Sequence, residues 1–268
     1  MSINIHPTAI VDSKAQLEAG VEVGPYSIIG PNVRIGARTK VGPHAVIEGY
    51  TTLGEDNEVF QFASVGGKPQ DLKYRGEPSR LVIGSKNSIR EFVTLHPGTT
   101  GGRMETTIGD GNLFMANTHV GHDCVVGNHN VFANSAALAG HVTVYNRVIV
   151  GGMVGIHQFS RIGDFAMLGG GSMVSQDIPP YCIGQGDRCH LRGINVIGLE
   201  RGGFSEDDVK MVKKVYRALF STMGKLSAKI ESLPEDFRSH EKIIPLLNFI
   251  EESERGICSP AKTLVTHE

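Results

Sequence analysis

Aliphatic residues recur at every sixth position along most of the chain. The first series starts at Ile5 and runs without interruption to Val65. It resumes in phase at Ile83 after one polar insertion, shifts by one position after a second insertion, and then runs from Ile108 to Val174. Small residues usually stand two positions before each aliphatic residue, and glycine often follows it.

A six-residue period indicates neither an isolated helix nor a plain meander, which repeat about every 3.6 and 2 residues. It is typical of short strands joined by tight turns, each strand turning one large side chain toward a narrow interior. Three strands make a coil of 18 residues, and coils stack about 4.8 Å apart through parallel ladder hydrogen bonds. We therefore predict a mainly β protein, a parallel β-helix of about ten coils over residues 1–190, with loop insertions near 66–80 and 97–107.

The six-residue period ends near residue 190, and a helical pattern follows. Ser205 with Asp208 resembles a capping box in which Asp replaces the usual Glu or Gln. Pro245 is expected to interrupt the last helix. Residues 191–268 should therefore form a small helical domain. Its predicted helices cover residues 209–223, 226–233 and 240–253.

Composition narrows the classes of function. The formal net charge is -2, so no basic field indicates binding to nucleic acid or to a membrane surface. The chain offers no stretch of 18 apolar residues for a membrane span, and its N-terminus does not have the pattern of a signal peptide. The four cysteines form no CxxC pair and suggest no disulfide framework. We expect a cytoplasmic protein of a reducing compartment, without an integral membrane segment.

Polar residues gather at corresponding positions of successive coils in the second half of the repeat. With 18 residues in a coil, His122 should lie beside Gly140, and Asp123 should lie beside His141. This register predicts one polar group on the outer surface over three coils. Its members are His119, His122, Asp123, Gly140, His141, His157 and Gln158.

Three interpretations of this group are open. Scaffolds of this type can hold zinc or iron through three imidazoles, although the spacing of His119 and His122 does not make both point the same way. The histidines could also be surface residues without a role. We favour a general base, because an imidazole with a pKa of about 6.5 accepts a proton from a hydroxyl near neutral pH. A neighbouring carboxylate such as Asp123 would fix its tautomer.

Gly140 extends this interpretation to acyl transfer. Because it has no side chain and lies one coil from His122, its N–H can donate to an oxyanion. Direct attack on an acyl donor would then need neither a covalent enzyme intermediate nor a cofactor. None of the four cysteines has a setting lined by bases that would favour a thiol nucleophile. The cysteines are Cys124, Cys182, Cys189 and Cys258.

Sequence motifs place the group in a family. The repeat resembles that of hexapeptide acyltransferases, which implies that the β-helix is left-handed. The stretches THVGHDCVVGN, AGHVTV, GGMVGIHQF and QDIPPYCIGQG, with the insertion QDLKYRGEPSRL, resemble the UDP-N-acetylglucosamine O-acyltransferase family over nearly the whole chain. The resemblance implies transfer of a 3-hydroxyacyl chain from acyl carrier protein to the 3-OH of UDP-N-acetylglucosamine, the first step of lipid A biosynthesis. It also implies a homotrimer with active sites between neighbouring β-helices.

The resemblance further implies roles for single residues. His122 would be the general base, Asp123 its orienting partner and the Gly140 N–H the oxyanion donor. Gly170 would limit the length of the acyl chain, and glycine at this position implies long, myristoyl-like chains. The residues implied in substrate binding are Asp71, Lys73, His119, His141, His157, Gln158, Asn195 and Arg201.

Two positions depart from the family pattern. Ile197 stands where members often carry an acidic residue, and Gly202 where they carry a second Arg. An acceptor with an amine at the acylated carbon therefore stays open. The closest rival is the sister N-acyltransferase of the pathway, which typically has an extra N-terminal domain, whereas the repeat here begins at Ile5. A rival of another class is a metal-dependent hydratase of the same fold.

Basic residues of the first long predicted helix are candidates for docking the carrier protein. Acyl carrier protein is acidic, and four cations recur at helical spacing. A solvated helix face is the alternative explanation of the same pattern. The four residues are Lys210, Lys213, Lys214 and Arg217.

Overall fold

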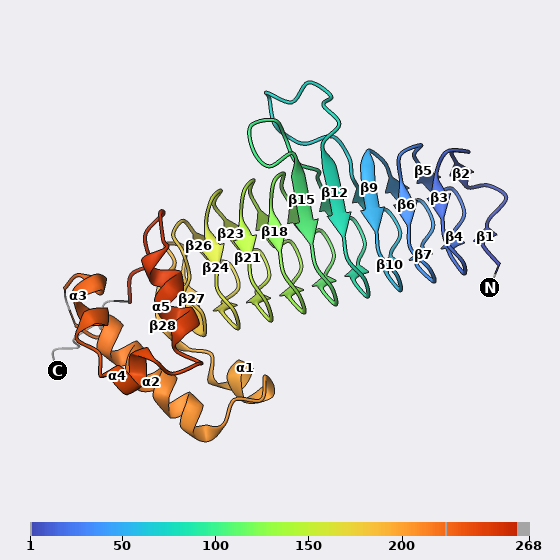
Figure 1. The fold of residues 1–268 in the computed structure, drawn as a ribbon. Coiled ribbons are helices and arrows are strands. Elements are labelled where there is room, and N and C mark those ends of the chain that lie inside the picture. Colours follow the sequence, from blue (N-terminus) through green and yellow to red (C-terminus); the bar gives the residue numbers. More distant parts are fainter. Residues whose placement is uncertain (1, 223, 262–268) are drawn as a thin grey trace.

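The computed structural model describes residues 2–222 and 224–261. Short strands wind into a column of stacked coils, and the helices gather at the end of the column opposite the N-terminus (Figure 1). From β1 to β26, each strand pairs in parallel with the strand three places along the chain, which gives three sheets. The fold is a left-handed parallel β-helix, and the prediction of this class is confirmed.

The three sheets form the three faces of the column. The first contains β1 (Asn4–Ile5), β4 (Glu22–Val23), β7 (Lys40–Val41), β10 (Glu58–Val59), β13 (Ser88–Ile89), β16 (Leu113–Phe114), β19 (Val131–Phe132), β22 (Ile149–Val150) and β25 (Met167–Leu168). The second contains β2 (Ile10–Val11), β5 (Ile28–Ile29), β8 (Val46–Ile47), β11 (Ser64–Val65), β14 (Thr94–Leu95), β17 (His119–Val120), β20 (Ala137–Leu138), β23 (Gly155–Ile156) and β26 (Met173–Val174). The third contains β3 (Gln16–Leu17), β6 (Arg34–Ile35), β9 (Tyr50–Leu53), β12 (Arg80–Ile83), β15 (Glu105–Ile108), β18 (Val125–Val126), β21 (Thr143–Val144) and β24 (Arg161–Ile162).

The residues of the six-residue period point into the column. In most two-residue strands the second residue is buried and the first faces outward, as in β7 and β17. Each coil turns one large side chain inward from each of its three strands, as Val120, Val126 and Phe132 do, and Phe132 stacks on Phe114 with ring centroids 4.8 Å apart. Interior side chains of successive coils therefore pack on one another along the axis of the column.

The turns from the third sheet to the first form what we call the asparagine corner. Four buried asparagines in this corner form a ladder, Asn57, Asn87, Asn112 and Asn130. The Oδ1 atom of each accepts the backbone N–H of the next at 2.8–2.9 Å, and Asn130 accepts from Val148 at 2.7 Å. The ladder thus satisfies buried backbone donors that the short strands do not reach.

The turns from the second sheet to the third form what we call the loop corner. Residues 66–79 leave it between β11 and β12, and residues 96–104 leave it between β14 and β15. Both insertions stand out from the column on one side (Figure 1). The coil period rises from 18 residues to 30 and 25 at these levels, yet the strands return to register.

The C-terminal part covers one end of the column. Strand β27 (Cys182–Gln185) extends the first sheet and forms an antiparallel hairpin with β28 (His190–Ile194). The helices are α1 (Val196–Arg201), α2 (Glu206–Phe220), α3 (Leu226–Glu231), α4 (Glu235–Arg238) and α5 (Ile244–Glu251). The part of the chain described contains no helix long and apolar enough to cross a membrane.

The helix predictions are confirmed in most respects. Ser205 and Asp208 form both hydrogen bonds of a capping box at the start of α2. Pro245 was expected to interrupt the last helix, and this was wrong, because it lies in the first turn of α5, where its missing N–H costs nothing. Helices α1, of six residues, and α4, of four, were not predicted. Residues 262–268 of the expected helical domain lie outside the described residues.

Candidate active site

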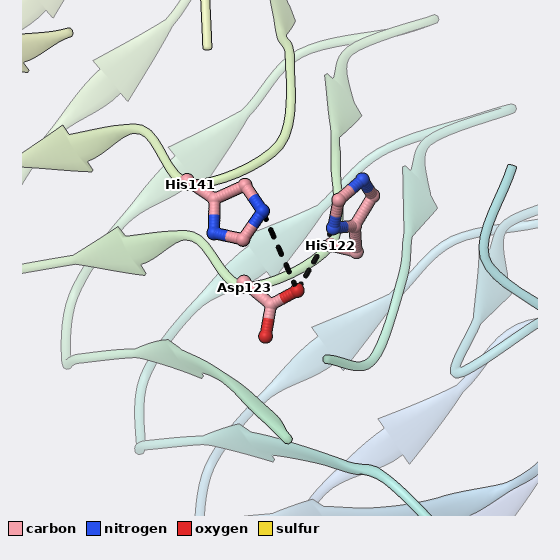
Figure 2. A group of neighbouring side chains, drawn as sticks. All are labelled: His122, Asp123 and His141. Carbon is pink, nitrogen blue, oxygen red and sulfur yellow. Dashed lines mark hydrogen bonds and ion pairs between the residues drawn. The ribbon is translucent and has the colours of Figure 1, made fainter. Parts of the chain in front are cut away.

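His122 and Asp123 lie together at the loop corner, in the turn between β17 and β18. The backbone φ of Asp123 is +60°, and that of His141, at the same place one coil later, is +63°. This left-handed conformation is uncommon outside glycine, but Asp, Asn and His tolerate it better than other residues. This conformation lets the chain turn tightly, and the side chains of Asp123 and His141 lie at the same outer edge of the column (Figure 2).

His122 and Asp123 form a hydrogen-bonded pair. His122 Nδ1 lies 2.8 Å from Asp123 Oδ2, and the Asp123 side chain is fully buried (Figure 2). Because a carboxylate oxygen only accepts, Nδ1 carries the proton and donates it to Asp123. The lone pair of the ring is then on Nε2, so His122 has the tautomer of a base that can accept a proton at Nε2.

The carboxylate of Asp123 is held by the second insertion. The Thr99 hydroxyl donates to Oδ2 at 2.7 Å, the Thr99 N–H donates to both oxygens at 3.1–3.2 Å, and the Arg103 N–H donates to Oδ1 at 2.7 Å. Burial alone would raise the pKa of Asp123, but the hydrogen bonds from His122, Thr99 and Arg103 together lower it. Asp123 therefore stays ionised beside His122.

His141 completes the group from the next coil. Its Nε2 lies 3.9 Å from Asp123 Oδ2, and its ring is perpendicular to that of His122 with centroids 5.0 Å apart. The other side of the ring stacks on Phe159 at 4.5 Å. Burial lowers the pKa of His141, and the charges of Asp123 and Asp71 only partly oppose this. His141 is therefore a neutral hydrogen-bonding group near pH 7.

Gly140 lies against His122, as the register predicted. A Cβ at this position would stand 2.5 Å from the His122 ring, so only glycine fits. Across the described residues, the Gly140 N–H donates to no backbone or side-chain acceptor. A Cβ on Gly121 would approach this nitrogen to 2.9 Å, so the absence of that side chain leaves the donor uncovered. The N–H can thus donate to an oxyanion next to His122.

His119 and His157 border a groove of about 760 Å³ on the second sheet. The floor consists of Ala137 and Gly155, which are small, and of Met173, and residues 187–190 line the groove beyond Met173. His119 Nδ1 lies 2.7 Å from the Thr94 hydroxyl, and burial lowers the pKa of His119. The groove is a long, mostly apolar surface that starts beside two imidazoles. Gln158 is exposed in the turn that follows His157.

Sequence reasoning missed His96. This residue is 5% exposed, and its ring meets His119 edge-on at 5.0 Å. Its Nδ1 accepts the N–H of Gln70 at 3.3 Å, and burial lowers its pKa to about 4. His96 is therefore neutral and joins the first insertion to the column. The 25-residue period at this level would have placed it beside Gly121, one residue from His122.

Asp71 and Lys73 lie on the first insertion. Asp71 Oδ1 accepts the Lys73 N–H at 2.9 Å, which closes a tight turn around Leu72. The charge of Asp71 acts on His141, so the insertion reaches the loop corner. Lys73 is exposed, and the Leu72 side chain between them is 96% exposed. The turn thus exposes the Leu72 side chain and the Lys73 cation, whereas Asp71 is half-buried.

Asn195 and Arg201 belong to α1, away from the polar group. Asn195 Oδ1 accepts the Gly198 N–H at 3.0 Å as a helix cap, and its Nδ2 donates to Phe165 at 2.9 Å. Arg201 is exposed at the other end of the helix. Within the described residues, no hydrogen bond or ion pair joins either of them to His122 or Asp123.

The two departures from the family pattern lie on the same helix. Ile197 is exposed. A side chain at Gly202 would collide with the ring of Phe165. The glycine at position 202 therefore follows from the packing of Phe165, whereas the structure gives no account of Ile197.

Gly170 lies at the turn from the first sheet to the second. The Gly171 N–H donates to the Gly152 carbonyl at 2.8 Å, so the glycines of these two coils stack as the register predicted. A Cβ on Gly170 would meet only the Gly152 backbone, at 3.3 Å from its oxygen, whereas a Cβ on Gly151 would lie 2.6 Å from the Gly170 nitrogen. A side chain at position 170 can therefore be accommodated outward.

The donor atoms of His122, Asp123 and His141 lie within 4.8 Å of one another, so this trio is also the candidate for metal binding. Two imidazoles and one carboxylate are suitable ligands for zinc or iron. However, both Asp123 oxygens already accept from Thr99 or Arg103, and His122 turns its Nδ1 proton toward the carboxylate. These hydrogen bonds favour His122 as a general base over the three residues as metal ligands.

Two family models match the chain. The model described as Udp N-acetylglucosamine O-acyltransferase, Domain 2, matches residues 177–258. The model described as Bacterial transferase hexapeptide (six repeats) matches residues 14–49 and 105–140.

Relatives match over nearly the full length. Proteins named acyl-[acyl-carrier-protein]--UDP-N-acetylglucosamine O-acyltransferase are 54% identical in Myxococcus xanthus and 52% identical in Burkholderia lata, in both cases over 94% of this chain and 98% of the relative. The structure of LpxA from Acinetobacter baumannii superposes with a TM-score of 0.92 at 45% identity and covers 95% of this chain and 99% of its own. The UDP-N-acetylglucosamine acyltransferase of Francisella novicida gives 0.93 at 34% identity, with 96% and 95% covered. The chain belongs to the UDP-N-acetylglucosamine O-acyltransferase family of hexapeptide-repeat proteins.

Proposed function

We propose that this protein transfers a 3-hydroxyacyl chain from acyl carrier protein to the 3-OH of UDP-N-acetylglucosamine, the first step of lipid A biosynthesis. The observation that carries the proposal is the His122–Asp123 pair beside the uncovered N–H of Gly140. Base and oxyanion donor stand on adjacent coils, which suits the attack of a hydroxyl on a thioester. The names of the relatives supply both substrates.

The chemistry needs no group beyond these residues. His122 Nε2 accepts the proton of the sugar hydroxyl while the oxygen attacks the thioester carbonyl. The charge that develops on the carbonyl oxygen is met by the Gly140 N–H, and ionised Asp123 stabilises the imidazolium. When the tetrahedral intermediate collapses, the carbon–sulfur bond breaks and protonated His122 gives the proton to the leaving thiolate. Ester and free carrier thiol are the products.

The remaining predicted residues would position the substrates. In this proposal His119, His141, His157 and Gln158 contact the sugar and the acyl carbonyl around the entrance of the groove. Asp71 and Lys73 would hold the sugar and its phosphate side from the first insertion. Arg201 would face the nucleotide, whereas Asn195 would act through the position of α1, because both ends of its amide are occupied.

A homotrimer in the cytoplasm is part of the proposal. Two features of the single chain support contact with a neighbouring β-helix. One is the exposed Leu72 on the first insertion, and the other is a row of apolar side chains on the outer face of the first sheet. This row consists of Leu113, Val131, Ile149 and Met167. Apolar side chains in such continuous rows usually mark an interface. Light scattering should give three times the chain mass, and a monomer of full activity would refute the assembly.

Helix α2 is the proposed contact for the acidic carrier protein. Lys213, Lys214 and Arg217 are exposed, whereas Lys210 already pairs with Asp207 at 3.0 Å. We expect Lys213→Glu with Arg217→Glu to raise KM for the carrier and to flatten its salt dependence. Lys210→Glu is the matched control with a smaller effect.

Product analysis tests the function. The purified protein is incubated with a mixture of 3-hydroxyacyl carrier proteins and UDP-N-acetylglucosamine, and the product is examined by mass spectrometry. One 3-O-acylated sugar nucleotide is expected. A parallel reaction with the 3-amino analogue decides between ester and amide formation. A preference for the 3-amino analogue would show that the acceptor is an amino sugar nucleotide. Transfer to neither acceptor, together with stoichiometric zinc or iron in the protein, would favour the hydratase.

A further inference from the structure

We propose that Thr99 is a positioning residue that commits the Asp123 carboxylate to His122 rather than to His141. The inference deepens the proposed function, on which it rests. Thr99 belongs to the second insertion, residues 96–104, whose sequence carries no repeat and no recognisable motif. Its side chain is buried within the loop corner, directly against Asp123.

Two histidines compete for the same carboxylate oxygen. Asp123 Oδ2 lies 2.8 Å from His122 Nδ1 and 3.9 Å from His141 Nε2. A modest rotation of the carboxylate would exchange these partners. An Asp123 that served His141 would leave the His122 ring free to take the other tautomer, with its lone pair on Nδ1 instead of Nε2. The choice of partner therefore decides whether His122 can act as the base.

The hydrogen bonds of Thr99 remove this freedom. The hydroxyl donates to Oδ2 at 2.7 Å, so this oxygen is fixed between Thr99 and His122. The Thr99 N–H bridges both oxygens, and the Arg103 N–H holds Oδ1 at 2.7 Å. A carboxylate with donors on both oxygens cannot rotate without breaking several charge-assisted hydrogen bonds.

Packing holds the insertion in place. A Cβ on Gly102 would collide with the Asp123 carboxylate, so the loop lies directly on it. The N–H groups of Gly102 and Met104 both donate to the Thr99 carbonyl, at 3.1 and 3.2 Å. The loop is thus closed around Thr99 by its own backbone. The Thr100 side chain points elsewhere and lies 3.2 Å from a carboxylate oxygen of Glu77 on the first insertion.

The test compares variants at two adjacent threonines. Thr99→Val replaces the hydroxyl with a methyl group of similar size, and Thr100→Val does the same one residue away, where the hydroxyl faces Glu77 instead of Asp123. We expect Thr99→Val to lower kcat about tenfold to a hundredfold with KM within twofold, because misplacement of a catalytic group acts mainly on the chemical step. Thr99→Ser should restore most of the rate, and Thr100→Val should leave it unchanged. If Thr99→Val does not fold, Thr99→Ala removes the same donor without placing a methyl group against the carboxylate.

A spectroscopic signal distinguishes positioning from general damage. The His122 Nδ1 proton shared with Asp123 should give a downfield proton resonance in the parent protein, absent in His122→Gln. The signal should weaken in Thr99→Val and persist in Thr100→Val.

Two results would overturn the inference: a Thr99→Val rate and signal equal to those of the parent, or a Thr99→Ser variant as impaired as Thr99→Val. Failure of the proposed function looks different. In that case the parent makes no acylated product, whereas the resonance still depends on Thr99.

Discussion

The asparagine corner and the loop corner are two turns of the same repeating coil, and their contents are opposite. In the asparagine corner, identical side chains repeat from coil to coil, and each amide accepts the backbone N–H of the next. In the loop corner the sequence changes at every level, two insertions leave the column, and His122, Asp123 and Gly140 follow them. Stability and chemistry thus occupy different edges of one repeating scaffold.

The difference shows how a repeat protein acquires a site. Successive coils offer the same outward positions at their corners, and Asp123 and His141 share a left-handed backbone there, so two coils bring chosen side chains within contact distance. What the repeat cannot supply is an environment that holds a carboxylate ionised and oriented. The irregular insertion supplies it through Thr99 and Arg103.

The largest expected effect separates the two corners by activity. His122→Ala should lower kcat by about 10²–10⁴-fold, the usual loss for a general base. The melting temperature should change little, because Asp123 keeps its bonds to Thr99 and Arg103. Steady-state kinetics and calorimetry measure both. A rate within threefold of the parent would remove His122 from the mechanism.

The converse substitution lies in the asparagine corner. Asn112→Ala removes the acceptor of the buried hydrogen bond from the Asn130 N–H and the donor of a part-buried hydrogen bond to the Gly127 carbonyl. Two lost partners should cost about 2–5 kcal/mol in the free energy of unfolding. kcat should stay within twofold. The exposed Asn32→Ala is the matched control, and a variant as stable as the parent would show that the ladder is dispensable.

Acid should act on the loop corner and not on the asparagine ladder, whose amides do not titrate. The pKa of His96 is lowered from 6.5 to about 4 in the folded protein. Between these values the unfolded chain binds a proton at His96 and the folded chain does not, so the free energy of unfolding falls as the pH drops below 6.5. At pH 5 it should be about 2 kcal/mol lower than above pH 6.5. His96→Gln should reduce the difference in the free energy of unfolding between pH 7.5 and pH 5, as measured by denaturant titration. A difference equal to that of the parent would assign the loss to other groups.

The smallest effect is expected at a third corner, between the first and second sheets. Gly170→Met places a side chain where the structure has room, and it should shift the preferred acyl donor from long chains to shorter ones. Each methylene excluded from an apolar groove costs about 0.8 kcal/mol, or nearly fourfold in kcat/KM. Competition among donors of different length measures the shift, with exposed Asn32→Met as control. An unchanged profile would move the limit of chain length to Met167 or Met173.

Those features of the site that depend on the 18-residue coil period could be predicted from the sequence. The 18-residue register placed Gly140 beside His122 and His141 beside Asp123, because parallel ladders fix vertical neighbours. It did not predict Thr99 on Asp123, since an aperiodic loop has no register to calculate. It also missed His96, because the loop changes the local period from 18 to 25 residues. For Asn195, spacing could not show that a helix N-terminus would occupy its amide.

Both insertions leave and rejoin the column within one corner, and this has an evolutionary consequence. The ends of each loop are held at the spacing of a single turn, so doubling its length costs only about 0.6 kcal/mol of closure entropy. The coils above and below keep their pairing, as the return of β12 and β15 to register shows. Loops at this edge can therefore be lengthened, shortened or exchanged while the column stays intact. Contacts to the acceptor that lie on the first insertion, such as those proposed for Asp71 and Lys73, can thus change without renewed selection for folding of the column.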